Sequence, residues 1–179
     1  MKTVNLYTFS ELSEEAKKVA VRNHDVDYDL QFLVDDEIER LTALGFDDVD
    51  ICYRLAFSQG DGVRMHGKIS FTNAVDLTGY KLSALKTKII DDWVALEISG
   101  NSVSVEWYHE QFLNYVDATV VAVVRELESW IEDNGRAFYR RLSNEALCQT
   151  SDEYKREDLE NNDGLYYYFE NGTPALYNF

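Results

Sequence analysis

Two alternating runs of apolar residues constrain this chain more than any other feature. In VDICYRLAF (49–57) and VRMHGKISF (63–71), large apolar side chains recur at almost every second position. Successive side chains point to opposite faces of a β-strand, so each run predicts a strand with one apolar face. The five residues between them (58–62) include two glycines, which is typical of a hairpin connection. The sequence therefore predicts an antiparallel hairpin.

The residues before this hairpin predict a short strand and two helices. TVNLYTF (3–9) is typical of a strand, and Ser13 is suited to cap a helix of about three turns that follows it. A second helix is expected from about residue 28 to residue 44, because Gly45 is a typical residue directly after a helix C-terminus.

The residues after the hairpin predict one more strand pair and further helices. WVALEIS (93–99) and SVSVEWYH (102–109) lie on either side of Gly100 and Asn101, which predicts a second hairpin. Residues 72–92 fit either a helix or an irregular excursion, and both alternatives stay open.

The last third of the chain predicts helix and then a closing hairpin. Apolar residues three and four positions apart from Phe112 onward predict a helix that ends at Asn134–Gly135. A separate helical segment is expected from residue 136 to 148, or on to about residue 160. Residues 164–179 predict a final hairpin across Asn171–Gly172.

This order of elements suits an antiparallel sheet of hairpins with helices packed on it, which is an α+β fold. A length of 179 residues is sufficient for one sizeable core, so we expect a single domain over residues 1–179.

The helix expected at 28–44 has one apolar and one acidic side. Asp35, Asp36 and Glu39 lie together on the acidic side when residues are placed at helical spacing. Glu37 falls within the apolar arc, where a carboxylate needs a partner or an escape to the edge. Phe32 lies among the carboxylates, where it is either an interface anchor or a ring packed under a neighbouring element.

The acidic residues are concentrated as well as numerous. The chain has 33 acidic and 17 basic residues, a net charge of −16. Residues 25–50 contain ten acids against one base, whereas residues 63–90 contain five bases against one acid. Such a charge repels nucleic acids and anionic membranes and favours a basic partner, although it also serves solubility. The candidate partner-binding residues are Asp25, Asp27, Asp29, Phe32, Asp35, Asp36, Glu39, Asp47 and Asp48.

Little in the sequence indicates export or a membrane. The N-terminal residues lack the apolar segment of a signal peptide, and no apolar run is long enough to span a bilayer. Cys52 and Cys148 do not suggest a disulfide framework. We therefore expect a cytoplasmic protein of a bacterial host, with no membrane partner and no direct contact with nucleic acid.

The hairpin connection is also a candidate ligand loop, formed by Gln59, Gly60, Asp61 and Gly62. Its sequence fits neither a phosphate-binding loop nor a calcium loop, so a turn is the favoured interpretation. His66 lies nearby on the second strand, but no nucleophile accompanies it. The three histidines show no metal-ligand spacing. We expect no enzyme activity, no metal and no cofactor.

Three segments resemble elements of small acidic phage-borne proteins: LYTFSELSEEAKKVAVRNH (6–24), AFSQGDGVRMHGKISF (56–71) and YYYFENGTPALYNF (166–179). Members of this group are mostly uncharacterised, and some are labelled in the manner of antitoxins. The resemblance implies a mobile-element source and a role in host manipulation or counter-defence.

These observations give three functional hypotheses. The first is a phage-type inhibitor, of the anti-CRISPR or anti-restriction kind, that binds a basic host protein by nucleic-acid mimicry. The second is an antitoxin-like or structural accessory module whose acids only keep it soluble. The third is an enzyme or ligand-binding protein that uses Gln59, Asp61 and His66.

Overall fold

The computed structural model describes residues 5–26, 29–56, 61–108 and 118–175. The chain is organised in two compact units. The sheet unit is Leu30–Ser143, and the terminal unit combines Met1–Asp29 with Asn144–Phe179. Whether the whole chain folds as one domain stays a prediction.

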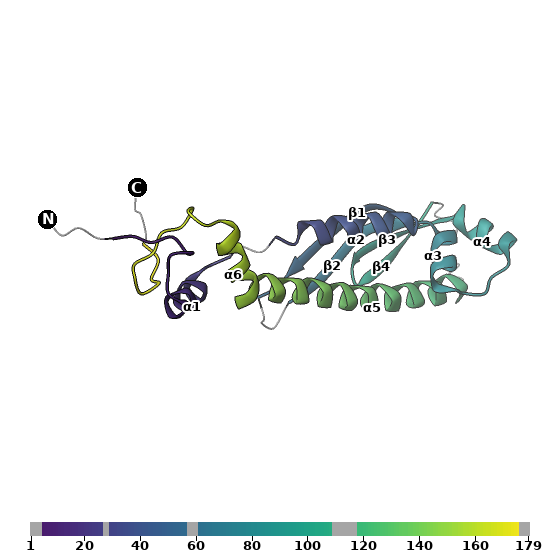
Figure 1. Cartoon of the computed structure of the whole chain (residues 1–179). Coiled ribbons are helices and arrows are strands. Elements are labelled where there is room, and N and C mark those ends of the chain that lie inside the picture. Colours follow the sequence, from purple (N-terminus) through teal and green to yellow (C-terminus); the bar gives the residue numbers. More distant parts are fainter. Residues whose placement is uncertain (1–4, 27–28, 57–60, 109–117, 176–179) are drawn as a thin grey trace. The chain divides into compact units, whose positions relative to one another are not determined.

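A four-stranded antiparallel sheet forms the centre of the sheet unit (Figure 1). Its strands follow one another in the sheet in chain order, and both predicted hairpins are present. The strands are β1 (Phe46–Arg54), β2 (Gly62–Ile69), β3 (Val94–Gly100) and β4 (Ser102–Trp107). With helices packed on this sheet, the molecule has the predicted α+β fold.

One face of the sheet is apolar and is covered by two helices, α2 (Gln31–Ala43) and the part of α5 (Ala118–Gln149) up to Ser143. Ile51 of β1 and Met65 of β2 pair on this face and are buried. Together with Leu41 of α2 and Phe138 of α5 they border one small internal space, so the sheet and both helices meet there. The alternation of each strand therefore places its apolar side against α2 and α5.

The opposite face of the sheet carries polar side chains. Cys52 and Arg64, which pair across β1 and β2, are both exposed. Lys68 pairs with Glu97 on β3, and both are also exposed. Among the described residues this face thus presents a polar surface.

The first strand differs from its predicted bounds. It begins at Phe46 instead of residue 49, and its register with β2 shifts between Asp47 and Asp50. The ring of Phe46 is buried and stacks on Trp130 of α5, with the ring centroids 5.7 Å apart. The contact with Trp130 fixes Phe46 in the core, so β1 begins three residues earlier than predicted.

Residues 72–92 form two short helices, α3 (Phe71–Thr78) and α4 (Ala84–Asp91). The hydroxyls of Ser70 and Ser83 accept hydrogen bonds from backbone N–H groups in the first turn of each helix. The prediction that β2 runs to Phe71 was wrong, because the Ser70 cap starts a helix there.

The predicted break at Asn134–Gly135 was also wrong, because α5 continues through it to Gln149. Ile131, Phe138 and Leu142 keep helical spacing across the glycine and are all buried. Continuous burial of one face therefore outweighs the local preference of glycine. The helix that follows, α6 (Asp152–Asn161), begins separately at the Ser151 cap.

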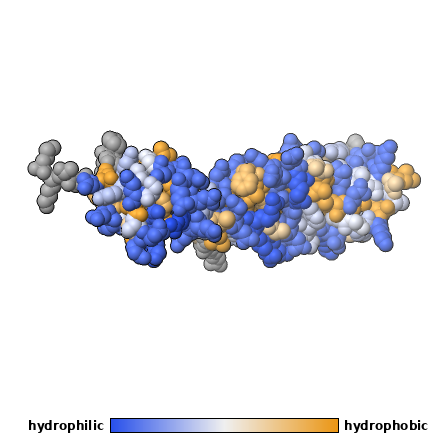
Figure 2. Space-filling view, in the orientation of Figure 1, coloured by the Kyte–Doolittle hydropathy of each residue, from blue (hydrophilic) through white to orange (hydrophobic). Residues whose placement is uncertain are grey.

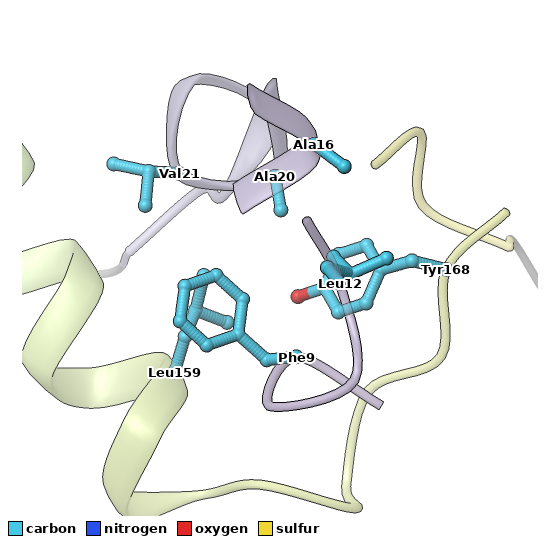
Figure 3. Close-up of a cluster of buried hydrophobic side chains, with 7 residues drawn as sticks. All are labelled: Phe9, Leu12, Ala16, Ala20, Val21, Leu159 and Tyr168. Carbon is cyan, nitrogen blue, oxygen red and sulfur yellow. The ribbon is translucent and has the colours of Figure 1, made fainter. Parts of the chain in front are cut away.

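The terminal unit packs α1 (Glu14–Asn23) and α6 around a small core (Figure 3). Ser13 caps α1 as predicted. The core consists of Phe9, Leu12, Ala16, Ala20, Val21, Leu159 and Tyr168. It joins segments from both ends of the chain.

The predicted terminal strands are reduced to single bridges in the described residues. Tyr7 pairs only with Tyr168, so no strand forms over residues 5–9. A tight turn does form at Asn171–Gly172, where the N–H of Phe169 donates to the carbonyl of Thr173 at 2.9 Å. The turn is confirmed, and residues 164–175 contain isolated bridges but no strand. The other bridge joins Tyr168 to Pro174, which has no N–H with which to extend a ladder.

Candidate functional site

The acidic side of α2 is exposed as the helical pattern predicted. Asp35, Asp36 and Glu39 are exposed, and Phe32 on the same side of the helix has 48% of its surface accessible. These four residues lie at steps of three, four and seven, so they form a continuous row, which we call the acidic stripe. Figure 2 shows that hydrophilic residues predominate on the visible face of the sheet unit, with hydrophobic residues in small separate patches.

Basic side chains do not neutralise the acidic stripe within the described part of the chain. Asp35 accepts a hydrogen bond from the Gln31 amide at 2.8 Å, and none of the ion pairs found there includes Asp35, Asp36 or Glu39. The stripe therefore keeps its negative charge and its exposed ring.

The other predicted partner-binding residues are divided among different parts of the molecule. Asp47 and Asp48 are exposed at the start of β1, where Asp48 lies 3.6 Å from the ammonium of Lys68. Such exposed pairs contribute little stability. Asp25 and Asp29 are exposed in the terminal unit, and Asp27 lies outside the described residues. Only the residues of the sheet unit can be placed relative to the stripe.

Glu37 lies on the opposite side of α2 and is buried, as its place in the apolar arc predicted. It has the partners that its charge requires. The guanidinium of Arg40 donates to both carboxylate oxygens at 2.6 and 3.0 Å, and Arg141 of α5 donates at 3.3 Å. The Asn134 amide donates at 3.0 Å and also accepts a hydrogen bond from Arg40.

This arrangement sets the protonation state of Glu37. Burial alone raises the pKa of a carboxyl group. The hydrogen bonds from Arg40 and Asn134, together with the charges of Arg40 and Arg141, outweigh this effect and hold the Glu37 pKa below its ordinary value of 4.5. Glu37 is therefore a structural carboxylate that joins α2 to α5, distinct from the exposed stripe.

A second feature of the sheet unit is a pocket of about 760 Å³ at one end of the sheet. It lies among the end of the β1–β2 hairpin, the β3–β4 turn and α5. Four arginines line it: Arg54, Arg64, Arg136 and Arg140. Within a chain of net charge −16, this concentration of positive charge is a local exception.

The pocket includes part of the predicted ligand loop. Asp61 and Gly62 line it, whereas Gln59 and Gly60 lie outside the described residues. His66 is not among the lining residues and instead pairs with Asp50 on β1 and Ser99 on β3. Of the described residues in this group, Asp61 therefore lines the pocket and His66 does not.

The sequence carries a signal for these four arginines. Arg54 and Arg64 lie at polar positions of the two alternating runs, near the turn that joins them. Arg136 and Arg140 are four residues apart, which places them on one side of a helix. The predicted helix break at Gly135 gives no reason to expect these four arginines at one site.

No cluster of metal-ligating side chains occurs within residues 5–26, 29–56, 61–108 and 118–175. In the same residues, none of the helices has the length and apolar character needed to cross a membrane. No protein-family model, curated protein or solved structure matches the chain.

Proposed function

We propose that the chain is a phage-type inhibitor that binds a basic, nucleic-acid-handling defence protein of a bacterial host through the acidic stripe of α2. The observation that carries this proposal is the stripe itself, in which three exposed carboxylates lie next to an exposed aromatic ring and have no basic partners among the described residues.

The carboxylates supply recognition and the ring supplies binding energy. Carboxylates one helical turn apart lie about 5–6 Å from each other and repel, so holding them together costs a few tenths of a kcal/mol per pair. A basic groove that normally holds nucleic acid removes this repulsion and attracts the stripe over a distance set by salt. Phe32 adds an apolar anchor of the kind that is enriched in interface hot spots.

The test is charge reversal within the stripe. The variant Asp35→Lys, Asp36→Lys, Glu39→Lys changes the net charge by +6, and so does the control Asp76→Lys, Glu126→Lys, Glu157→Lys. The control residues are exposed acids on α3, α5 and α6. Wild type and control should capture the same nucleic-acid-binding protein from a bacterial lysate, and should prevent it from binding or cutting DNA. The stripe variant should do neither.

Salt provides the second readout. Capture by the wild type should be strong at about 0.05 M salt and weak at about 0.5 M, because screening shortens the range of the attraction. Equal loss of binding in both variants would show that only net charge matters and would contradict a role for the stripe. Capture that is insensitive to both salt and the stripe would favour an antitoxin-like module with an apolar contact.

A further inference from the structure

The arginine-lined pocket is formed because the β1–β2 hairpin extends beyond the rest of the sheet. β3 begins to pair with β2 only at Met65, whereas β1 continues to pair from Arg64 to Gly62. The last residues of β1, the first residues of β2, Asn101 and α5 border a space that is within the usual size of small-molecule sites.

Acidic side chains balance only part of the positive charge in this pocket, which Asp61 and Glu132 also line. Arg136 forms ion pairs with Glu132 and Asp133, both at 2.7 Å. By contrast, none of the ion pairs among the described residues includes Arg54, Arg64 or Arg140. All three are exposed, so their guanidinium groups are available to an anion from outside the protein.

Gly135 supplies an independent observation at the same place. It lies inside α5 and lines the pocket, and a Cβ atom added there would meet no atom within 4 Å. Glycine is a poor residue for a helix interior, and here no neighbouring atom requires its small size. The space beside Gly135 is therefore open on the side of the pocket, and a larger side chain at this position can be used to fill it.

We infer that this pocket binds a small molecule carrying two or more phosphate groups. Guanidinium groups match phosphate oxygens in bidentate geometry, and several arginines around one space suit a polyanion. Tyr53 and Tyr139 also line the pocket and offer ring surfaces to a base or another flat group. The site is separate from the acidic stripe, so it does not depend on the proposed function.

Titration calorimetry with two probes tests this inference. The probes are inorganic tripolyphosphate and a nucleoside triphosphate, at about 0.05 M salt to limit screening. We expect both to bind the wild-type chain. Arg64→Gln with Arg140→Gln should weaken binding at least about tenfold, because two charge-assisted contacts are lost. The control Lys88→Gln with Arg125→Gln removes the same charge from exposed positions outside the pocket and should leave binding unchanged.

A substitution that fills the pocket separates loss of binding from loss of folding. Gly135→Leu should block the pocket and abolish binding while raising the melting temperature, because leucine is a better helix former. Ala137→Leu, at an exposed position of the same helix, should leave binding intact. A nucleoside triphosphate that binds at least about tenfold more tightly than tripolyphosphate would show that the base is recognised. Equal affinities would identify the phosphate chain as the ligand.

Three results would overturn the inference. The first is that neither probe binds the wild-type chain, even if a single-stranded oligonucleotide does. The second is that the control pair weakens binding as much as the pocket pair. The third is that Gly135→Leu retains full affinity in a folded chain.

Discussion

The two units carry the same net charge and arrange it in different ways. The terminal unit has 14 acidic and 6 basic residues, and the sheet unit has 19 and 11, so each has a net charge of −8. In the terminal unit, bases lie next to acids. Arg156 contacts Glu14 at 2.8 Å and Glu160 at 3.1 Å, and His24 contacts Asp158 at 2.7 Å. In the sheet unit, four arginines line one pocket, and three carboxylates form a row on α2.

This difference shows that net charge alone does not identify a binding surface. In the terminal unit, several of the bases pair with acids, and one such pair, Arg156–Glu14, links α6 to α1. The sheet unit also contains ion pairs, such as those of Glu37 and Arg136. In the described residues, however, the carboxylates of the acidic stripe and three of the pocket arginines form none, so each group produces a local field that can attract a partner or a ligand of opposite charge. The sheet unit is therefore the part of the molecule in which we expect binding.

The largest expected effect concerns the small core of the terminal unit. Phe9→Ala should destabilise the chain by about 3–5 kcal/mol, because it removes a buried ring from a cluster of seven residues. Urea unfolding measures the loss, and hydrogen exchange should rise most in the terminal unit. Phe169→Ala, which truncates an exposed ring of the same unit, is the control and should cost less than about 0.5 kcal/mol. An equal rise in hydrogen exchange in both units of Phe9→Ala would contradict a separate core in the terminal unit.

An intermediate effect is expected from the buried carboxylate of the sheet unit. Glu37→Gln should cost about 1–3 kcal/mol at neutral pH, because Arg40 and Arg141 lose a charged acceptor. The pKa of Glu37 is lowered by folding, so its contribution is present above its ordinary pKa of 4.5 and is lost as the pH falls below that value.

The difference between Glu37→Gln and wild type should therefore shrink when urea unfolding is repeated at about pH 3. The matched control is Glu39→Gln, an exposed carboxyl on the same helix. A cost at Glu39 equal to that at Glu37 would contradict the role of the buried network.

The smallest effect is the difference between two glycines that both adopt a left-handed backbone. Gly79 ends α3 with φ 67° in open space, whereas Gly172 has φ 82° and an added Cβ there would meet the carbonyl oxygen of Ala16 at 2.0 Å. Gly79→Ala should cost about 1 kcal/mol from backbone strain. Gly172→Ala should cost at least about 1 kcal/mol more, because the turn must also move away from α1. Thermal unfolding of both variants checks the difference, and equal melting temperatures would argue against a tight packing of this turn.

The parts of the fold that follow from local pattern could be predicted from the sequence. Alternation in 49–57 and 63–71 gave the hairpin, and helical spacing in 28–44 gave α2 with its acidic side and the buried position of Glu37. Those features depend on which side of a single helix or strand faces the core. The spacing of apolar residues along the sequence indicates that side.

The features that depend on distant residues could not be predicted in this way. The partners of Glu37 on α5 lie about a hundred positions away in the chain, and Gly135 stays helical because of packing on both sides of it. The pocket forms where residues of β1 and β2 lie near α5. The predicted helix break at Gly135 hid this site, because Arg136 and Arg140 then belonged to a separate helix. The single bridges at Tyr168 likewise depend on contacts between the two ends of the chain.

The irregular start of β1 has a consequence for how the molecule behaves at high concentration. β1 is an outer strand of the sheet, and its register shift falls among Asp47, Asp48 and Asp50, all of them exposed. An outer strand with a regular ladder and neutral side chains invites the same strand of another molecule to pair with it, which leads toward fibres. Here the interrupted ladder and the mutual repulsion of the aspartates oppose that pairing, so the edge is protected against self-assembly by the same kind of side chain that we expect to attract a partner.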